Sequence, residues 1–311
     1  SRVLKILLKD KTTKKNIIWA TDEYSNFGIG YSADDEIYPT DIEGITSIIT
    51  PRVAKSKEAQ TTRIRGMAEV FTPSWVCNKQ NNLIDDAWFG RKNVFNIETD
   101  KGWRTINEKI EFSNEKGKTW QDYVKANRLE ISCGEAPYLT SRYDAVSGEI
   151  IPVCDRIGFL DRKLRIVSEN IDSEQKWYVW AKKAMQSVYG YDWQGDNVLL
   201  ARENLLFTFV EYYESKFGVP PIPEYLLDIA KVLAWNIFQM DGIKFVVPNS
   251  CKNTIVSTET LLGVETKEER CIGCQTNDNE HHNGIYCRIY DWPANRSIEF
   301  YSLYKGAKNG D

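Results

Sequence analysis

Between residues 129 and 241 the chain alternates strand-like and helix-like segments, and this alternation constrains the fold more than any other feature. Short apolar runs at 129–131, 188–192 and 236–241 predict strands. Apolar residues at helical spacing predict helices over 177–187, 197–213 and 224–235, with a Gly/Pro-rich break at 218–223. We therefore expect an α/β fold with a doubly wound, mostly parallel sheet.

The flanking segments suggest how the rest of the chain is organised. We expect a small β-rich N-terminal segment over residues 1–64, which begins with a strand over 1–8, and the main domain over residues 65–311. Insertions are expected at about 139–187 and 249–284. Ser74 can cap a helix that runs through Leu83, residues 90–127 predict loops with short elements, and 285–290 predict a further strand.

Composition excludes several classes of protein. No run of about 18 apolar residues occurs, which argues against a membrane span. The first eight residues are too short an apolar run, and are followed too soon by charge, for a secretory signal. Seven cysteines without regular spacing indicate a reducing compartment, so we expect a cytoplasmic protein. The net charge of −4 gives no basic surplus, and a DNA substrate would require a local basic patch or a partner subunit.

Four motifs follow one another along the chain. They are A-E-V-F-T-P at 68–73, L-E-I-S-C-G-E-A-P-Y at 129–138, Y-G-Y-D-W at 189–193 with A-R-E-N-L at 201–205, and N-I at 236–237 followed by D-G-I at 241–243. In this order they resemble the N6-adenine DNA methyltransferases that act as modification subunits of restriction–modification systems. The resemblance implies a methyltransferase-type fold and a bound S-adenosylmethionine.

The residues themselves suit such a cofactor. A glycine after the first strand lets the backbone approach a ligand, and Gly134 stands there. An acid after the second strand can accept from a ribose diol. Asp192 follows an apolar strand and precedes a strong helix, which favours this role over the alternatives of a helix cap or a solvated acid. The resemblance gives Asp241 the cofactor's adenine amine, with a turn aspartate as the alternative. It assigns cofactor contacts to Phe71, Thr72, Pro73, Glu130, Cys133, Gly134, Ala136, Asp192, Trp193 and Asp241.

The chain departs from the family at the base-handling motif. Adenine methyltransferases carry Asn/Asp-Pro-Pro-Tyr/Phe after the fourth strand, where it holds the flipped base. The best positional match is Asp291-Trp292-Pro293-Ala294, which gives Asp291, Trp292 and Pro293 as catalytic candidates, with an ordinary turn as the alternative. The resemblance therefore implies either adenine methylation in DNA, with a partner protein that reads sequence, or a catalytically silent cofactor-binding partner or decoy.

A second departure is the long interval between Gly134 and Asp192. Dinucleotide-type sites usually place about 20 residues between the glycine loop and the ribose acid. The insertion contains several basic residues within ten positions, 156–165. These residues either face phosphates or lie on a solvated helix face with Asp155 and Asp161 as partners.

Cysteine and histidine gather near the C-terminus. Cys-x-x-Cys spacing and nearby histidines suit tetrahedral zinc, and ligation by protein alone would make the site structural. The alternative is a set of free thiols on a flexible hairpin. The candidate ligands are Cys271, Cys274, His281, His282 and Cys287.

Overall fold

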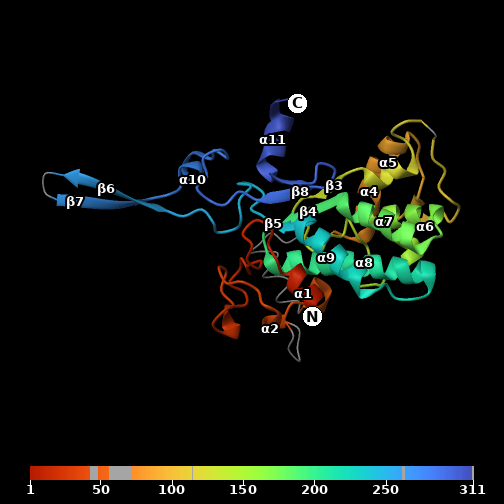
Figure 1. Ribbon diagram of the computed structural model, residues 1–311, viewed down its shortest axis with the longest axis horizontal. Coiled ribbons are helices and arrows are strands. Elements are labelled where there is room, and N and C mark those ends of the chain that lie inside the picture. Colours follow the sequence, from red (N-terminus) through yellow and green to blue (C-terminus); the bar gives the residue numbers. More distant parts are fainter. Residues whose placement is uncertain (43–47, 56–71, 114, 261–262, 310–311) are drawn as a thin grey trace.

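A parallel three-stranded sheet lies at the centre of the fold (Figure 1). The computed structural model describes residues 1–42, 48–55, 72–113, 115–260 and 263–309. The sheet has the order β3-β4-β5, with both pairs parallel, which confirms a mixed α/β fold. Among the described residues the sheet does not continue past β3 or β5, so the expected doubly wound sheet is not seen there. Its strands are β3 (Arg128–Glu130), β4 (Val188–Asp192) and β5 (Ile237–Gln239).

Four helices form the connections of this sheet and most of its core, and three of them were predicted. Helices α6 and α7 join β3 to β4, and helices α8 and α9 join β4 to β5. Their wide apolar faces pack together and against the strands, because α7, α8 and α9 all contact β4. The αL residue Gly218 ends α8, as the Gly/Pro break predicts. The bounds are α6 (Phe159–Asn170), α7 (Glu174–Gln186), α8 (Gly195–Phe217) and α9 (Pro223–Asn236).

The N-terminal segment is not built of strands in its described part. The strand expected over 1–8 is wrong: these residues form α1 (Arg2–Leu7), whose buried face packs on α9. A short apolar run cannot distinguish strand from helix by periodicity alone, and packing decides here. The β structure at 1–42 and 48–55 consists of isolated bridges. The other elements are 3-10 turns at Ser25–Phe27 and Arg52–Ala54 and helix α2 (Pro39–Ile42).

Residues 72–113 and 115–125 form a layer beside α6. The predicted helix is confirmed as α4 (Ser74–Phe89), but Ser74 is its first residue and Pro73 takes the cap position that was expected for Ser74. The expected loop region holds short elements, as predicted. Thr119 caps the last of these elements through a reciprocal hydrogen-bonded box with Asp122. The elements are hairpin β1 (Asn96–Thr99) and β2 (Gly102–Thr105) and helix α5 (Trp120–Lys125).

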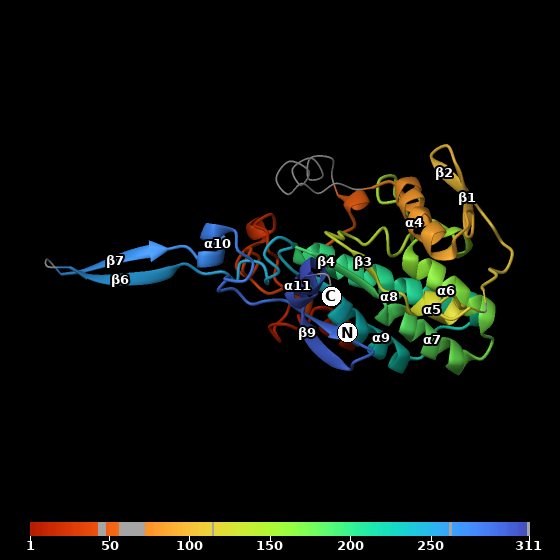
Figure 2. The same cartoon turned by 90° about the horizontal axis from the view of Figure 1, so that it is seen from above.

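The C-terminal part carries an arm that projects from the body, as both ribbon views show (Figures 1 and 2). The arm is the antiparallel hairpin β6 (Thr254–Thr260) and β7 (Gly263–Glu269), and α10 (Ile272–Thr276) lies at its base. A second hairpin, β8 (Arg288–Asp291) and β9 (Arg296–Glu299), precedes α11 (Phe300–Asn309). No helix in the described part of the chain has the length and apolarity to cross a membrane.

Arg162 and Lys163 of the insertion are structural, and neither sequence interpretation holds for these two residues of α6. Arg162 is fully buried and its guanidinium pairs with the Asp85 carboxylate of α4. Lys163 is buried as well, and its ammonium donates to the carbonyl of Ala126 and the hydroxyl of Ser187. Burial lowers the pKa of Lys163 well below its usual value. These cations connect α6 to its neighbours and do not face phosphates or solvent.

Replacing Asp85 by alanine tests the buried pair. The Arg162 guanidinium would lose its carboxylate inside the core, and we expect a loss of about 3–5 kcal/mol in the free energy of unfolding, measured by urea denaturation. Asp172→Ala is the matched control, because it breaks the Lys216 pair at a carboxylate that is 98% exposed. Equal midpoints for the two variants would show that the buried pair does not carry this stability.

Candidate functional site

Three carboxylates lie at or just beyond the carboxyl edge of the parallel sheet. Glu130 ends β3, Asp192 ends β4, and Asp241 follows β5 by two residues. The register pairs Asp192 with Gln239, so the ends of β4 and β5 are level. All three side chains are buried. Ligands of open α/β sheets bind at this edge, which makes it the first place to look for a site.

Asp192 connects three elements through its carboxylate. Its Oδ2 accepts from the amide of Gly134 at 2.9 Å, which joins β4 to the loop after β3. Its Oδ1 accepts from the amide of Gln194 at 3.0 Å and from the side chain of Asn197 at 3.3 Å, at the start of α8. Burial raises the pKa of Asp192, and these donors oppose the rise. Both sequence alternatives for Asp192, a plain solvated acid and a helix cap, therefore understate what it contacts.

The loop after β3 has an unusual backbone. Ser132, Gly134 and Ala136 have φ values of 48°, 51° and 65°, in the left-handed region that favours glycine. Ala136 is fully buried. A Cβ placed on Gly134 would have no atom within 4 Å, so open space faces this backbone. Cys133 donates its amide to Tyr191 and extends the pairing with β4.

The A-R-E-N-L motif supports this loop from α8. The side chain of Asn204 donates to the carbonyl of Glu135 at 3.0 Å and to the hydroxyl of Tyr143. The same hydroxyl binds the carboxylate of Glu135, whose other oxygen accepts from the amide of Arg52 at 2.6 Å. The glycine loop is thus fixed by side chains far away in sequence.

Glu130 closes the loop from the other side. Its two oxygens accept from the amides of Tyr138 at 3.3 Å and Leu139 at 3.2 Å. Burial raises the pKa of Glu130 to about 8, and the two amides only partly oppose this rise. Glu130 therefore shapes the loop in the manner of a turn-capping acid, with a carboxyl group that is protonated near neutral pH.

The Thr-Pro motif lies beside the same loop. Phe71 is outside the described residues. Pro73 directly precedes α4, and the carbonyl of Thr72 accepts from the Cys77 thiol at 3.7 Å. Asn81 of α4 donates to the carbonyl of Tyr138, so the helix that follows Thr-Pro packs on the end of the glycine loop.

Asp241 and Trp193 each have a structural partner. Oδ1 of Asp241 accepts from the amides of Ile243 and Lys244 at 2.9 and 3.1 Å, which is the turn geometry named as the alternative. Its Oδ2 lies 3.6 Å from the ammonium of Lys244. The indole of Trp193 donates to the carbonyl of Ala20. Asp241 thus lies beside Asp192 along the edge, with one oxygen occupied by the turn.

The structure does not bring Asp291, Trp292 and Pro293 to this edge. Asp291 ends β8, and Trp292 and Pro293 begin the turn of the β8–β9 hairpin, where the carboxylate of Asp291 accepts from the amide of Ala294 at 3.1 Å. The indole of Trp292 donates at 2.8 Å to the side chain of Asn236, which itself binds the carbonyl of Val188. Asn236 directly precedes β5 and Val188 begins β4, so the turn lies at the amino edge of the sheet.

Three cysteines and a histidine form a cluster that can hold a metal ion such as zinc. The ligand atoms of Cys251, Cys271, Cys274 and His282 all lie within 4.8 Å of one another. Burial raises the pKa of Cys271, but amide donors led by Asn283 outweigh it and bring the value down to about 6. Three of these four residues were predicted from the sequence. Cys251 was not, because it lies 20 positions before Cys271.

The other two predicted metal ligands lie outside the cluster. Cys287 is fully buried, and its thiol contacts the carbonyl of Gln239 at 3.4 Å. His281 is exposed and pairs with Asp278 at 2.7 Å. The choice between the two histidines, left open by the sequence, therefore falls to His282.

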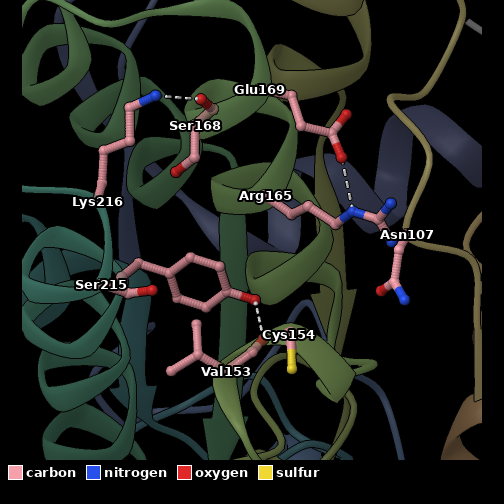
Figure 3. Close-up of a pocket in the computed structure, with 9 residues that line it drawn as sticks. Asn107, Val153, Cys154, Arg165, Ser168, Glu169, Ser215 and Lys216 are labelled. Atoms are coloured by element: carbon pink, nitrogen blue, oxygen red, sulfur yellow. Dashed lines mark hydrogen bonds and ion pairs between the residues drawn. The ribbon is translucent and has the colours of Figure 1, made fainter.

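Two further cavities differ in the side chains that line them. A pocket of about 280 Å³ contains the exposed Cys154, but its cations already have partners: Arg165 binds Glu169 and Lys216 binds the carbonyl of Ser168 (Figure 3). A cleft of about 840 Å³ lies beside Pro73. Aromatic and basic side chains line part of this second cleft, namely Trp75, Lys101, Trp103 and Arg104.

The chain matches no known protein family, no curated protein and no solved structure.

The raised pKa of Glu130 predicts how stability depends on pH. Between its unfolded pKa near 4.5 and its folded pKa near 8, the folded protein holds a proton that the unfolded chain has released. The free energy of unfolding should therefore fall as pH rises through this window, by an amount on the order of a few kcal/mol. Glu130→Gln cannot titrate, so its unfolding midpoint should depend less on pH between 5 and 8. Parallel pH profiles for the wild type and this variant would contradict the assignment.

Proposed function

We propose that this chain binds S-adenosylmethionine at the carboxyl edge of β3, β4 and β5, as a methyltransferase-like protein of a DNA modification or phage-conflict system. One observation carries the proposal: the buried Asp192 carboxylate ends β4 and holds the amide of Gly134 in the glycine loop. A carboxylate kept in such a desolvated place is typical of a functional site.

The residues at the edge fit the cofactor. A carboxylate offers about four lone-pair positions, and Asp192 uses three of them on Gly134, Gln194 and Asn197. The remaining position is on Oδ2, to which Gly134 alone donates among the described residues, and this position can accept from a ribose hydroxyl. Open space in front of Gly134 lets a ligand approach the loop. Asp241, one strand further along, has its Oδ2 left for the adenine amine and for Lys244.

The chemistry divides between cofactor and chain. S-adenosylmethionine, when bound, supplies an electrophilic methyl group on its sulfonium. In the proposal Asp192 orients the ribose, Asp241 the adenine ring, and the Thr-Pro segment together with the glycine loop encloses the methionine end.

The cleft beside Pro73 is the DNA-facing part of the proposal. Trp75 and Trp103 offer rings for base stacking, and Lys101 and Arg104 offer charge to phosphates. Two of the acids that line it are already engaged: Asp144 accepts from the amide of Ser74 and Asp155 from the hydroxyl of Thr105. This local patch suits a chain whose overall charge is negative.

A catalytically silent partner is the second candidate, and the position of Asp291 favours it. A base acceptor must lie on the same edge as the cofactor, but Trp292 binds Asn236 at the amino edge. The proposal therefore gives Asp291 no part in the reaction. Cofactor binding is common to both candidates, and methyl transfer separates them.

Calorimetry with S-adenosylmethionine tests the cofactor site. We expect the wild type to bind, and Asp192→Asn or Asp241→Asn to bind about 10–100-fold more weakly, since each loses a charge-assisted hydrogen bond. Asp241→Asn keeps an oxygen for its turn, so its fold should survive even if that of Asp192→Asn does not. Asp291→Asn is the control and should bind as the wild type does. No binding by the wild type, or equal affinities for all variants, would overturn the proposal.

Transfer of a labelled methyl group to DNA separates the two candidates. We expect any transfer by the wild type to survive Asp291→Ala, because this side chain lies away from the cofactor edge. Transfer that is lost in Asp291→Ala while cofactor binding persists would contradict this expectation and restore Asp291 as the acceptor. No transfer by a wild type that binds the cofactor would support the silent partner.

A further inference from the structure

The cluster at the base of the arm has the geometry of a tetrahedral metal site. Nδ1 of His282 lies 3.7, 3.8 and 3.6 Å from the sulfurs of Cys251, Cys271 and Cys274. Zinc bonds of about 2.3 Å to sulfur and about 2.0 Å to nitrogen at tetrahedral angles place these atoms roughly 3.5 Å apart. The four side chains therefore already surround one point at nearly the required spacing.

Two glycines allow this close approach. A Cβ on Gly273 would come within 2.7 Å of both the amide and Nδ1 of His282. A Cβ on Gly284 would lie 2.9 Å from the sulfur of Cys251. Real Cβ atoms do not approach other atoms so closely, so any side chain at either position would push a ligand out of place.

Groups around the cluster orient its ligands. Nε2 of His282 lies 3.4 Å from the side-chain oxygen of Asn279, which leaves Nδ1 free for a metal. The amide of Asn283 donates to the sulfur of Cys271 at 3.1 Å, as expected for a thiolate. Three thiolates and an imidazole select zinc over the oxygen-seeking magnesium and calcium.

The cluster lies where the arm leaves the body. Cys251 precedes β6 by three residues and Cys271 follows β7 by two, so a shared metal would join both legs of the hairpin (Figures 1 and 2). Side chains reinforce the neck, since Asn253 donates to Glu268 and Asn283 to the carbonyl of Lys252. A lone two-stranded hairpin is only marginally stable in water. The arm therefore depends on its anchor.

We propose that Cys251, Cys271, Cys274 and His282 bind one structural Zn²⁺ that clamps the neck of the β6–β7 arm. Four protein ligands leave no open position, so the ion orders the chain and does not act on a substrate. This site is independent of the cofactor proposal and stands if that proposal fails.

Metal analysis of the purified full chain tests the site. We expect about one zinc per chain in the wild type, retained in His281→Asn and Cys154→Ser and lost in Cys251→Ser and His282→Asn. The first two variants are matched controls, because each removes a histidine or cysteine outside the cluster. A zinc-free wild type after growth with added zinc, or full zinc in Cys251→Ser, would overturn the proposal.

Cobalt substitution and proteolysis add readouts that do not depend on activity. After chelation, Co²⁺ should give tetrahedral visible bands and a near-ultraviolet thiolate band in the wild type and in His281→Asn, but not in His282→Asn. Chelator should also speed cleavage within residues 251–271 while the circular dichroism of the body stays unchanged. Cobalt spectra without thiolate bands, or cleavage of the arm unaffected by chelation, would count against the clamp.

Discussion

Arg202 is the residue on which the arrangement of the sheet depends. It lies fully buried in α8, and its guanidinium donates to the carbonyls of Ile237 at 2.8 Å, Ala234 at 3.2 Å, Lys9 at 3.1 Å and Leu7. The ends of α1 and α9 thus receive a positive charge where their carbonyls lack helical partners. Burial lowers the pKa of Arg202 to about 10, but it stays charged. One side chain holds α1, α9 and the start of β5 against α8.

With β5 held in this position, its end lies level with the end of β4 at the carboxyl edge of the sheet. Asp192 reaches back to Gly134 and forward to the start of α8, and Asn204, two residues after Arg202, holds the same loop from behind. Two residues of the A-R-E-N-L motif therefore have different roles on α8: Arg202 binds carbonyls at the ends of α1 and α9, and Asn204 binds the glycine loop. The structure stabilises the loop with buried polar contacts to both oxygens of Asp192, and the proposed ligand would use the one lone-pair position that remains on Oδ2.

Local patterns predicted the central elements well, because the spacing of apolar residues that marks a helix or a strand is visible within a single segment. The predicted helices α4, α7, α8 and α9 and strands β3, β4 and β5 are confirmed within a few residues. The predicted strand at 1–8 was wrong because its apolar residues suit either conformation and the contact with α9 decides. Arg162 was misjudged for a similar reason: its partner Asp85 lies 77 residues away.

The sequence by itself determined the order of the central elements from α7 to β5, and it placed acids at the end of β4 and after β5. It also showed that cysteines and a histidine gather near the C-terminus. Only the tertiary structure decided which of these residues meet. It exchanged Cys287 for Cys251 in the cluster, chose His282 over His281, and put Asp291 at the edge opposite Asp192. Spacing along a chain reports the local backbone, whereas a site is formed by contacts between distant segments, and no local pattern shows which of these segments meet.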